Sequence, residues 1–161
     1  MVCDTDREYA DQLIAFADRL LSRGTDDPMQ VRMSNAASNL GDTVRAMRPM
    51  VPAKDYETSK RFYLDLGFQP RQLAERLFEM ELGTFSFILQ DYYVEDWANN
   101  FVMHVLVTDL DRWWQHISAL DLSGRYGVKT LPPKQESWGV VAGLIDPCGV
   151  LWRFTQARPS S

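Results

Sequence analysis

Residues Trp138 to Gln156 contain two apolar runs, Gly139 to Ile145 and Val150 to Gln156, joined by Asp146-Pro147-Cys148-Gly149. An Asp at the first position of a turn can accept hydrogen bonds from the backbone that follows it. Pro favours the second position and Gly the fourth. The pattern therefore predicts a tight strand-turn-strand unit, around which the rest of the chain is organised.

A helical pattern follows an Asp at two earlier places in the sequence. Asp55 precedes apolar residues at helical spacing that end at Gly67, and Asp109 precedes a second such set. The two Asp residues are 54 positions apart. Because Asp favours the position just before a helix, each is predicted to cap one, and the spacing indicates a repeat.

Strand patterns surround both predicted helices in the same order. The first unit, residues 48–91, has a short strand with period-two alternation from Arg48, then strands at Phe68–Leu73, Leu77–Leu82 and Phe85–Gln90. The second unit, residues 101–156, has strands at Phe101–Val107 and near Val128–Leu131, then the hairpin. A linker rich in aromatic and acidic residues, Tyr92–Asn100, separates the units. Each unit is predicted to be β-α-β-β-β, which makes the fold α+β.

Residues 1–47 lie outside this repeat. Thr5 and Glu8 form a capping-box pattern before apolar residues at helical spacing. Asp27-Pro28 begins a second helical pattern that continues to Met47 and can break near Gly41. We expect an N-terminal helical hairpin that covers the main domain or a partner chain. Residues 157–161 are expected to form a tail.

Composition excludes several classes of protein. The chain has 161 residues, of which 45% are hydrophobic, enough for one domain with a core. Its net charge of −5 and the lack of a basic stripe argue against nucleic-acid binding. No apolar run approaches the roughly 18 to 20 residues of a membrane span. The polar, acidic N-terminus is unlike a signal peptide, so we expect a cytoplasmic protein without a membrane partner.

Several short motifs accompany the repeat: Phe62-Tyr63, Leu66-Gly67-Phe68, Trp138-Gly139 and Asp146-Pro147-x-Gly149. With the tandem βαβββ order, they resemble the glyoxalase/bleomycin-resistance group, also called the vicinal-oxygen-chelate (VOC) superfamily. The resemblance covers about residues 48–156. It implies curved mixed sheets around a cleft, and a homodimer whose clefts use sheets from both chains.

The resemblance also implies four cleft positions that hold a divalent ion in the metal-using members. In this chain two cationic and two aliphatic residues occupy them: Arg48, Ile88, Val102 and Arg153. Guanidinium groups repel a cation, and aliphatic side chains offer no lone pair. We therefore expect no metal, no other cofactor and no catalytic residue. The preferred interpretation is a non-catalytic binding protein of the bleomycin-resistance type, which would sequester a drug or another small molecule in antibiotic resistance.

Strand alternation within the resemblance predicts a mostly apolar small-molecule cleft with a few polar groups. Its predicted ligand-binding residues are Arg48, Met50, Ser86, Ile88, Gln90, Trp97, Val102, His104, Leu151 and Arg153. The two arginines favour an anionic ligand, because guanidinium forms bidentate hydrogen bonds with carboxylates. Trp97 and Tyr92, in the linker, favour an aromatic ligand that stacks on them.

Three alternatives stay open. Each arginine can pair with a carboxylate such as Glu79 or Glu81 instead of with a ligand. His104 can line the cleft, or it can act as a general acid or base in a lyase or dioxygenase-like enzyme of the same superfamily, with a displaced metal or without one. The N-terminal helices can also bind a partner or plug the cleft, in which case the protein is an interaction module.

Overall fold

The computed structural model describes residues 40–158. The chain divides into two compact parts, and the boundary between them falls between Met47 and Arg48. Before that boundary, Leu40–Thr43 form a 3-10 helix, η1, and residues 44–49 contain no helix or strand. The second helical pattern does not form a helix as far as Met47, and it ends near Gly41, where the sequence allows a break because Gly is a weak helix former. The rest of the predicted helical hairpin lies outside the described residues.

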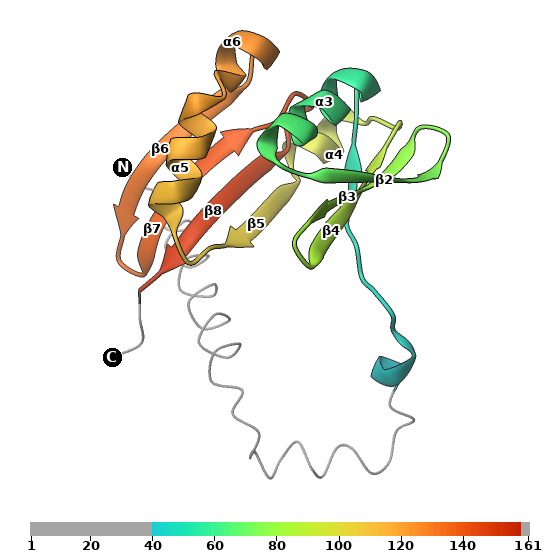
Figure 1. Cartoon of the computed structure of the whole chain (residues 1–161), viewed down its shortest axis with the longest axis horizontal. Coiled ribbons are helices and arrows are strands. Elements are labelled where there is room, and N and C mark those ends of the chain that lie inside the picture. The colour runs from blue at the N-terminus through green and yellow to red at the C-terminus, as the bar shows by residue number, and fades with distance from the viewer. Residues whose placement is uncertain (1–39, 159–161) are drawn as a thin grey trace. The chain divides into compact units, whose positions relative to one another are not determined.

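Residues 48–158 contain two four-stranded sheets, each formed by one β-α-β-β-β unit (Figure 1). The first has the order β1-β4-β3-β2 and consists of β1 (Met50–Pro52), β2 (Gln69–Ala74), β3 (Leu77–Leu82) and β4 (Phe85–Gln90). The second has the order β5-β8-β7-β6 and consists of β5 (Val102–Leu106), β6 (Lys129–Glu136), β7 (Gly139–Ile145) and β8 (Leu151–Ala157). In both sheets the first strand is parallel to the last, and the other neighbours are antiparallel. The predicted α+β architecture with tandem units is confirmed.

Each unit begins its main helix with an Asp. Oδ1 of Asp55 accepts a 3.0 Å hydrogen bond from Thr58 N at the start of α3 (Tyr56–Leu66). Oδ1 of Asp109 likewise accepts a 2.9 Å bond from Arg112 N at the start of α5 (Leu110–Ala119). The Thr58 backbone bond is the main cause of a lowered pKa for Asp55. Both predicted caps are confirmed.

Three elements differ from the sequence expectation. Two short helices, α4 (Glu95–Asn99) in the linker and α6 (Leu122–Tyr126) after α5, were not predicted. Strand β6 is longer than the predicted strand near Val128–Leu131 and runs through Pro132 and Pro133 to Glu136. It is the outer strand of its sheet, and its pairing with β7 shifts register between Leu131 and Lys134. The missing N–H groups of the two prolines therefore remove few hydrogen bonds from the sheet. No helix of residues 40–158 is long and apolar enough to cross a bilayer.

The two β-α-β-β-β units share one aromatic core. Trp152 of β8 lies among aromatic rings of the first unit, with centroids 5.5 Å from Tyr63, 5.6 Å from Phe68 and 5.3 Å from Phe87. In the second unit, α5 packs across β6, β7 and β8 (Figure 1). Because the helices and this core cover one face of each sheet, the opposite faces supply the more exposed positions.

A buried carboxylate organises the turn between β7 and β8. Oδ1 of Asp146 accepts hydrogen bonds from the backbone N–H of Cys148, at 2.8 Å, and of Val150, at 2.9 Å. Oδ2 accepts a bond from the hydroxyl of Tyr63 in α3, and Trp152 Nε1 donates to that hydroxyl at 3.2 Å. Burial raises the pKa of Asp146, and these hydrogen bonds oppose the rise. The predicted hairpin is confirmed, and its turn is tied to the first unit.

Candidate ligand-binding site

A buried carboxylate also lies on the first sheet. Glu79 of β3 is 2% exposed. It forms ion pairs with Arg48 and Arg71 and accepts a 2.6 Å hydrogen bond from Ser86 Oγ. Nε of Arg48 also donates to Ser86 Oγ at 2.8 Å. A carboxylate removed from water needs such partners, so this cluster is a stable part of the sheet.

The cluster determines what two predicted ligand-binding residues do. The alternative in which an arginine pairs with Glu79 holds for Arg48, whose charge is compensated within the chain. Ser86 takes part in the same cluster. Ile88 is the register partner of both Glu79 and Met50, so it lies on the same face of the sheet. The sequence analysis named Glu79 as a possible partner of the arginines but did not place it among the site residues.

Four more predicted residues form pairs on β5 and β8. In the parallel register of these strands, Val102 lies opposite Leu151 and His104 opposite Arg153. His104 Nε2 is 3.0 Å from Thr155 Oγ1. Burial, and secondarily the charge of Arg153, lowers the pKa of His104. The imidazole is therefore neutral near pH 7 and can donate and accept hydrogen bonds.

The guanidinium of Arg153 differs from that of Arg48. Within the described part of the chain, Arg153 forms no ion pair and no side-chain hydrogen bond. Its side chain is half-buried beside His104. A half-buried cation without a counter-charge is a candidate for binding an anionic group.

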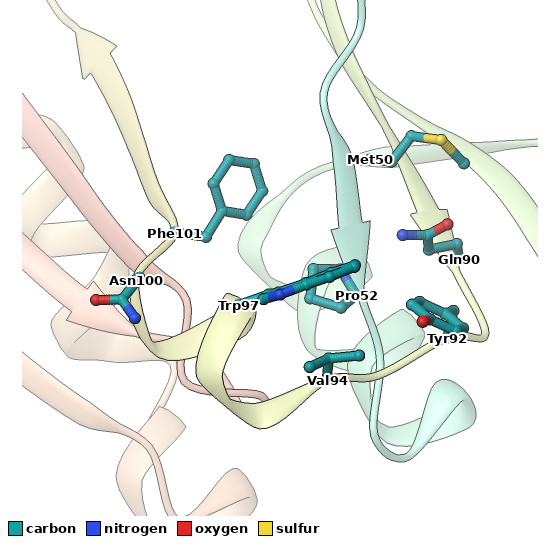
Figure 2. Close-up of a pocket in the computed structure, with 8 residues that line it drawn as sticks. All are labelled: Met50, Pro52, Gln90, Tyr92, Val94, Trp97, Asn100 and Phe101. Atoms are coloured by element: carbon teal, nitrogen blue, oxygen red, sulfur yellow. The ribbon is translucent and has the colours of Figure 1, made fainter.

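The remaining predicted residues, Met50, Gln90 and Trp97, line one pocket of about 250 Å³. It lies where β1 and β4 end, α4 passes and β5 begins (Figure 2). The other residues that line it are Pro52, Tyr92, Val94, Asn100 and Phe101. Of these, only Tyr92 was expected from the sequence, as a stacking candidate. We call this cavity the Trp97 pocket.

Aromatic side chains dominate the Trp97 pocket. Figure 2 shows the Trp97 indole between Phe101 on one side and Pro52 and Tyr92 on the other. The Trp97 side chain is 67% exposed and Tyr92 53%, and their ring centroids are 6.3 Å apart at an interplanar angle of 50°. The side-chain amide of Gln90 makes no hydrogen bond to the described residues, so it can orient a bound molecule.

The structure therefore divides the ten predicted residues into three groups. One is the Trp97 pocket, one is the face around Glu79 with Arg48, and one is the His104–Arg153 pair with its neighbours. No hydrogen bond or ion pair between residues 40 and 158 joins Arg48 to Arg153. The two arginines belong to different sheets.

The positions at which a VOC metal is implied do not fit a divalent ion. Arg48 and Arg153 have no lone pair to donate, and the nearest carboxylate to Arg48, Glu79, is already paired with two arginines. Within residues 40–158, no three His, Cys, Asp or Glu side chains are grouped so that they could hold a metal. Divalent ions need oxygen, imidazole or thiolate ligands, which these positions do not supply together.

Comparison of sequences gives no result: no family model matches the chain and no curated protein matches it. Comparison of structures shows that the chain has the fold of the glyoxalase/bleomycin-resistance proteins. A bleomycin resistance determinant encoded on the transposon Tn5 has a TM-score of 0.60 and 21% identity, covering 72% of this chain and 100% of the other. The predicted resemblance to the VOC superfamily is confirmed at the level of the fold.

Two further solved structures show the range of proteins with this fold. A bleomycin-binding protein from bleomycin-producing Streptomyces verticillus, complexed with copper(II)-bleomycin, has a TM-score of 0.59 and 21% identity, covering 71% of this chain and 99% of the other. A fosfomycin resistance protein, FosX, from Listeria monocytogenes, complexed with Mn(II) and sulfate, has a TM-score of 0.56 and 11% identity, covering 71% of this chain and 92% of the other.

Proposed function

We propose that this protein binds a small planar aromatic molecule, without transforming it, in the Trp97 pocket. The observation that carries the proposal is that Met50, Gln90 and Trp97, which come from three separate segments, line one apolar pocket. A concave, mostly apolar pocket with a few polar groups is the usual form of a small-molecule site. Proteins of the same fold that bind bleomycin support this class of function.

Stacking on Trp97 would supply much of the binding energy. An indole that is 67% exposed gains from being covered by a second ring. A favourable aromatic pair contributes about 0.5–1.5 kcal/mol beyond the burial of its area. The free amide of Gln90 would add direction to this contact through one or two hydrogen bonds.

The charge of the ligand is a separate part of the proposal. Because Glu79 compensates Arg48, an anionic group would depend on Arg153 alone. The Trp97 pocket itself has acidic neighbours, Glu95 and Asp96, in the first turn of α4. A ligand bound only in this pocket would therefore be neutral or cationic, whereas a ligand that extends to Arg153 would carry an acid group.

A homodimer is also part of the proposal. Met50 and Val102 are 47% and 41% exposed, which is unusual for apolar residues inside strands. A second copy that covered them would remove this apolar surface from water. Sedimentation velocity over a hundredfold range of concentration would test it, and a sedimentation coefficient that stays at the monomer value would contradict it.

The experiment that tests the ligand proposal is calorimetric titration with bleomycin and with a panel of planar aromatic compounds. At least one compound should saturate at one site per chain, and Trp97→Ala should weaken it roughly tenfold or more. Leu73→Ala is the matched control, because Leu73 is 42% exposed but does not line this pocket. If no compound binds at millimolar concentration, or if Trp97→Ala leaves the affinity unchanged, the proposal fails.

The position of His104 favours a second candidate function, acid-base catalysis without a metal. Its imidazole is neutral, is oriented by Thr155 and lies beside the cation Arg153. A neutral imidazole can accept a proton from a ligand whose developing negative charge is stabilised by the guanidinium. Mass spectrometry of a ligand after long incubation would test this, since a product that is lost in His104→Gln would indicate an enzyme.

A further inference from the structure

A second, larger cavity lies away from the Trp97 pocket and shares no residue with it. It has a volume of about 800 Å³, within the roughly 300–1,000 Å³ typical of small-molecule sites. It is formed by the end of α3, the β3–β4 turn around Gly83, the end of β5 and the start of α5. We call it the Phe85 groove. None of the ten residues predicted from the sequence lines it.

Large apolar side chains form the walls of the Phe85 groove. Phe85 is 80% exposed and Leu106 is 53% exposed, although both lie in strands. Trp113 of α5 lines the same groove and packs against the ring of Phe154, with centroids 4.8 Å apart at an angle of 30°. A rigid indole and an exposed phenyl ring in one groove can enclose an apolar molecule.

The polar groups of the groove lie along α5. The guanidinium of Arg112 forms no ion pair with any residue from 40 to 158. The carboxylate of Asp109 also lines the groove, and it accepts the Arg112 backbone N–H at the start of α5, where the positive end of the helix dipole lies. One ring nitrogen of His116 donates to the carbonyl of Leu66 at 3.2 Å. Among the described residues that line the groove, Arg112 is therefore a cation without an ion-pair partner, and it remains available to an acid group.

We propose that the Phe85 groove is a second binding site, which takes a small organic anion with an apolar body. The body lies against Phe85, Leu106 and Trp113, and the acid group pairs with Arg112. The argument is independent of the Trp97 pocket, so either site can exist without the other. The apolar walls disfavour strongly hydrophilic molecules, and the charge of Arg112 favours an anionic ligand over a neutral one of the same shape.

The test uses the full chain and a matched pair of probes, 1-naphthoate and 1-naphthamide, which differ only in the charge of one group. Naphthoate should bind more tightly than naphthamide, by roughly tenfold for one charge-assisted contact. Arg112→Gln should remove this difference, Phe85→Ala should weaken naphthoate binding, and Trp97→Ala should leave naphthoate binding unchanged. Because Arg112 and Phe85 are exposed, both variants should keep the fold.

Nuclear magnetic resonance on the unmodified protein gives a second readout. Naphthoate should shift the indole N–H signal of Trp113 and leave that of Trp97 in place. The proposal is overturned if naphthoate does not bind at millimolar concentration, if Arg112→Gln leaves the preference for naphthoate intact, or if Trp97→Ala abolishes binding. It is also overturned if neither probe binds and Phe85→Ala converts a dimer to a monomer. That result would mean that a second copy of the chain covers the groove in the wild type.

Discussion

The hydroxyl of Tyr63 donates a 2.5 Å hydrogen bond to Oδ2 of Asp146, and this bond connects α3 of the first unit with the hairpin turn of the second. Both groups are buried, and Trp152 Nε1 donates to the same hydroxyl. The Tyr63 hydroxyl oxygen is therefore the hydrogen-bond partner of two buried atoms, Oδ2 of Asp146 and Nε1 of Trp152. Its removal should reveal how strongly the two units depend on each other.

Tyr63→Phe should lower the free energy of unfolding by about 2–3 kcal/mol, because it leaves a buried carboxylate oxygen and an indole N–H unpaired. Urea unfolding followed by fluorescence would measure this. Tyr126→Phe is the control, since its hydroxyl bonds to the partly exposed Asp65 and its removal should cost less than about 1 kcal/mol. Equal losses in the two variants would contradict a special role for Tyr63.

The raised pKa of Asp146 predicts a dependence of stability on pH. Since the pKa is higher in the folded than in the unfolded chain, the group stabilises the fold most at pH values below its unfolded pKa. That contribution is lost as pH rises through the folded pKa. The stability of the wild type relative to Asp146→Asn should therefore fall as pH rises from the unfolded pKa, about 3.9, through the folded value. A difference that is constant with pH, or that grows, would refute this.

Gly149→Ala should destabilise the hairpin turn. Gly149 has φ of 97°, and an added Cβ would lie 2.3 Å from the side-chain oxygen of Asn99 in α4. The backbone strain alone should cost about 1–2 kcal/mol in thermal or urea unfolding. The double variant Gly149→Ala with Asn99→Ala separates the two causes: it relieves the collision and leaves the strain. Full recovery of stability in the double variant would show that strain is unimportant.

Glu79→Gln should destabilise the first sheet by about 1–3 kcal/mol, because Arg48 and Arg71 lose the carboxylate that compensates both charges. The loss is limited because both arginines are partly exposed and can be hydrated. Glu81→Gln is the matched control, since Glu81 is 42% exposed and pairs only with Arg71. It should cost less than about 1 kcal/mol. Similar losses from the two substitutions would contradict the central role of Glu79.

The neighbouring charge of Arg153 contributes to the lowered pKa of His104, after burial. Arg153→Gln should therefore raise the pKa of His104, and the larger effect of burial should keep it below its usual value. Titration of the imidazole by nuclear magnetic resonance would measure the shift. A His104 pKa that does not change would remove the electrostatic link between the two residues.

Much of the fold was predictable because local chemistry specifies it. The helix caps Asp55 and Asp109 act through the backbone of the next few residues, and Gly67 adopts a φ of 109° that other residues avoid. Alternation placed the strand Leu77–Leu82 at its observed bounds. Strand β6 was shortened in the prediction because prolines usually end a strand, whereas an outer strand with a register shift tolerates them.

The site was less predictable, because it depends on contacts between distant segments. Alternation identified Met50 and Gln90 as residues of one face, and the loop position of Trp97 indicated a ligand contact, but nothing local showed that the three meet. The pairing of Arg48 with Glu79 spans two strands and decides whether a cation is available. The Phe85 groove was missed entirely, since its walls come from four segments that share no motif.

Strand β6 has a further consequence for how copies of this protein can meet. It forms the outer edge of the second sheet, and Pro132 and Pro133 in its middle carry no N–H group. An unpaired edge with a full set of donors is a template for strand addition, which leads to aggregation and fibrils. The two prolines interrupt that template at the register shift, so β6 is poorly suited to recruit a strand from a neighbouring molecule, and the sheet is protected from growing at this edge.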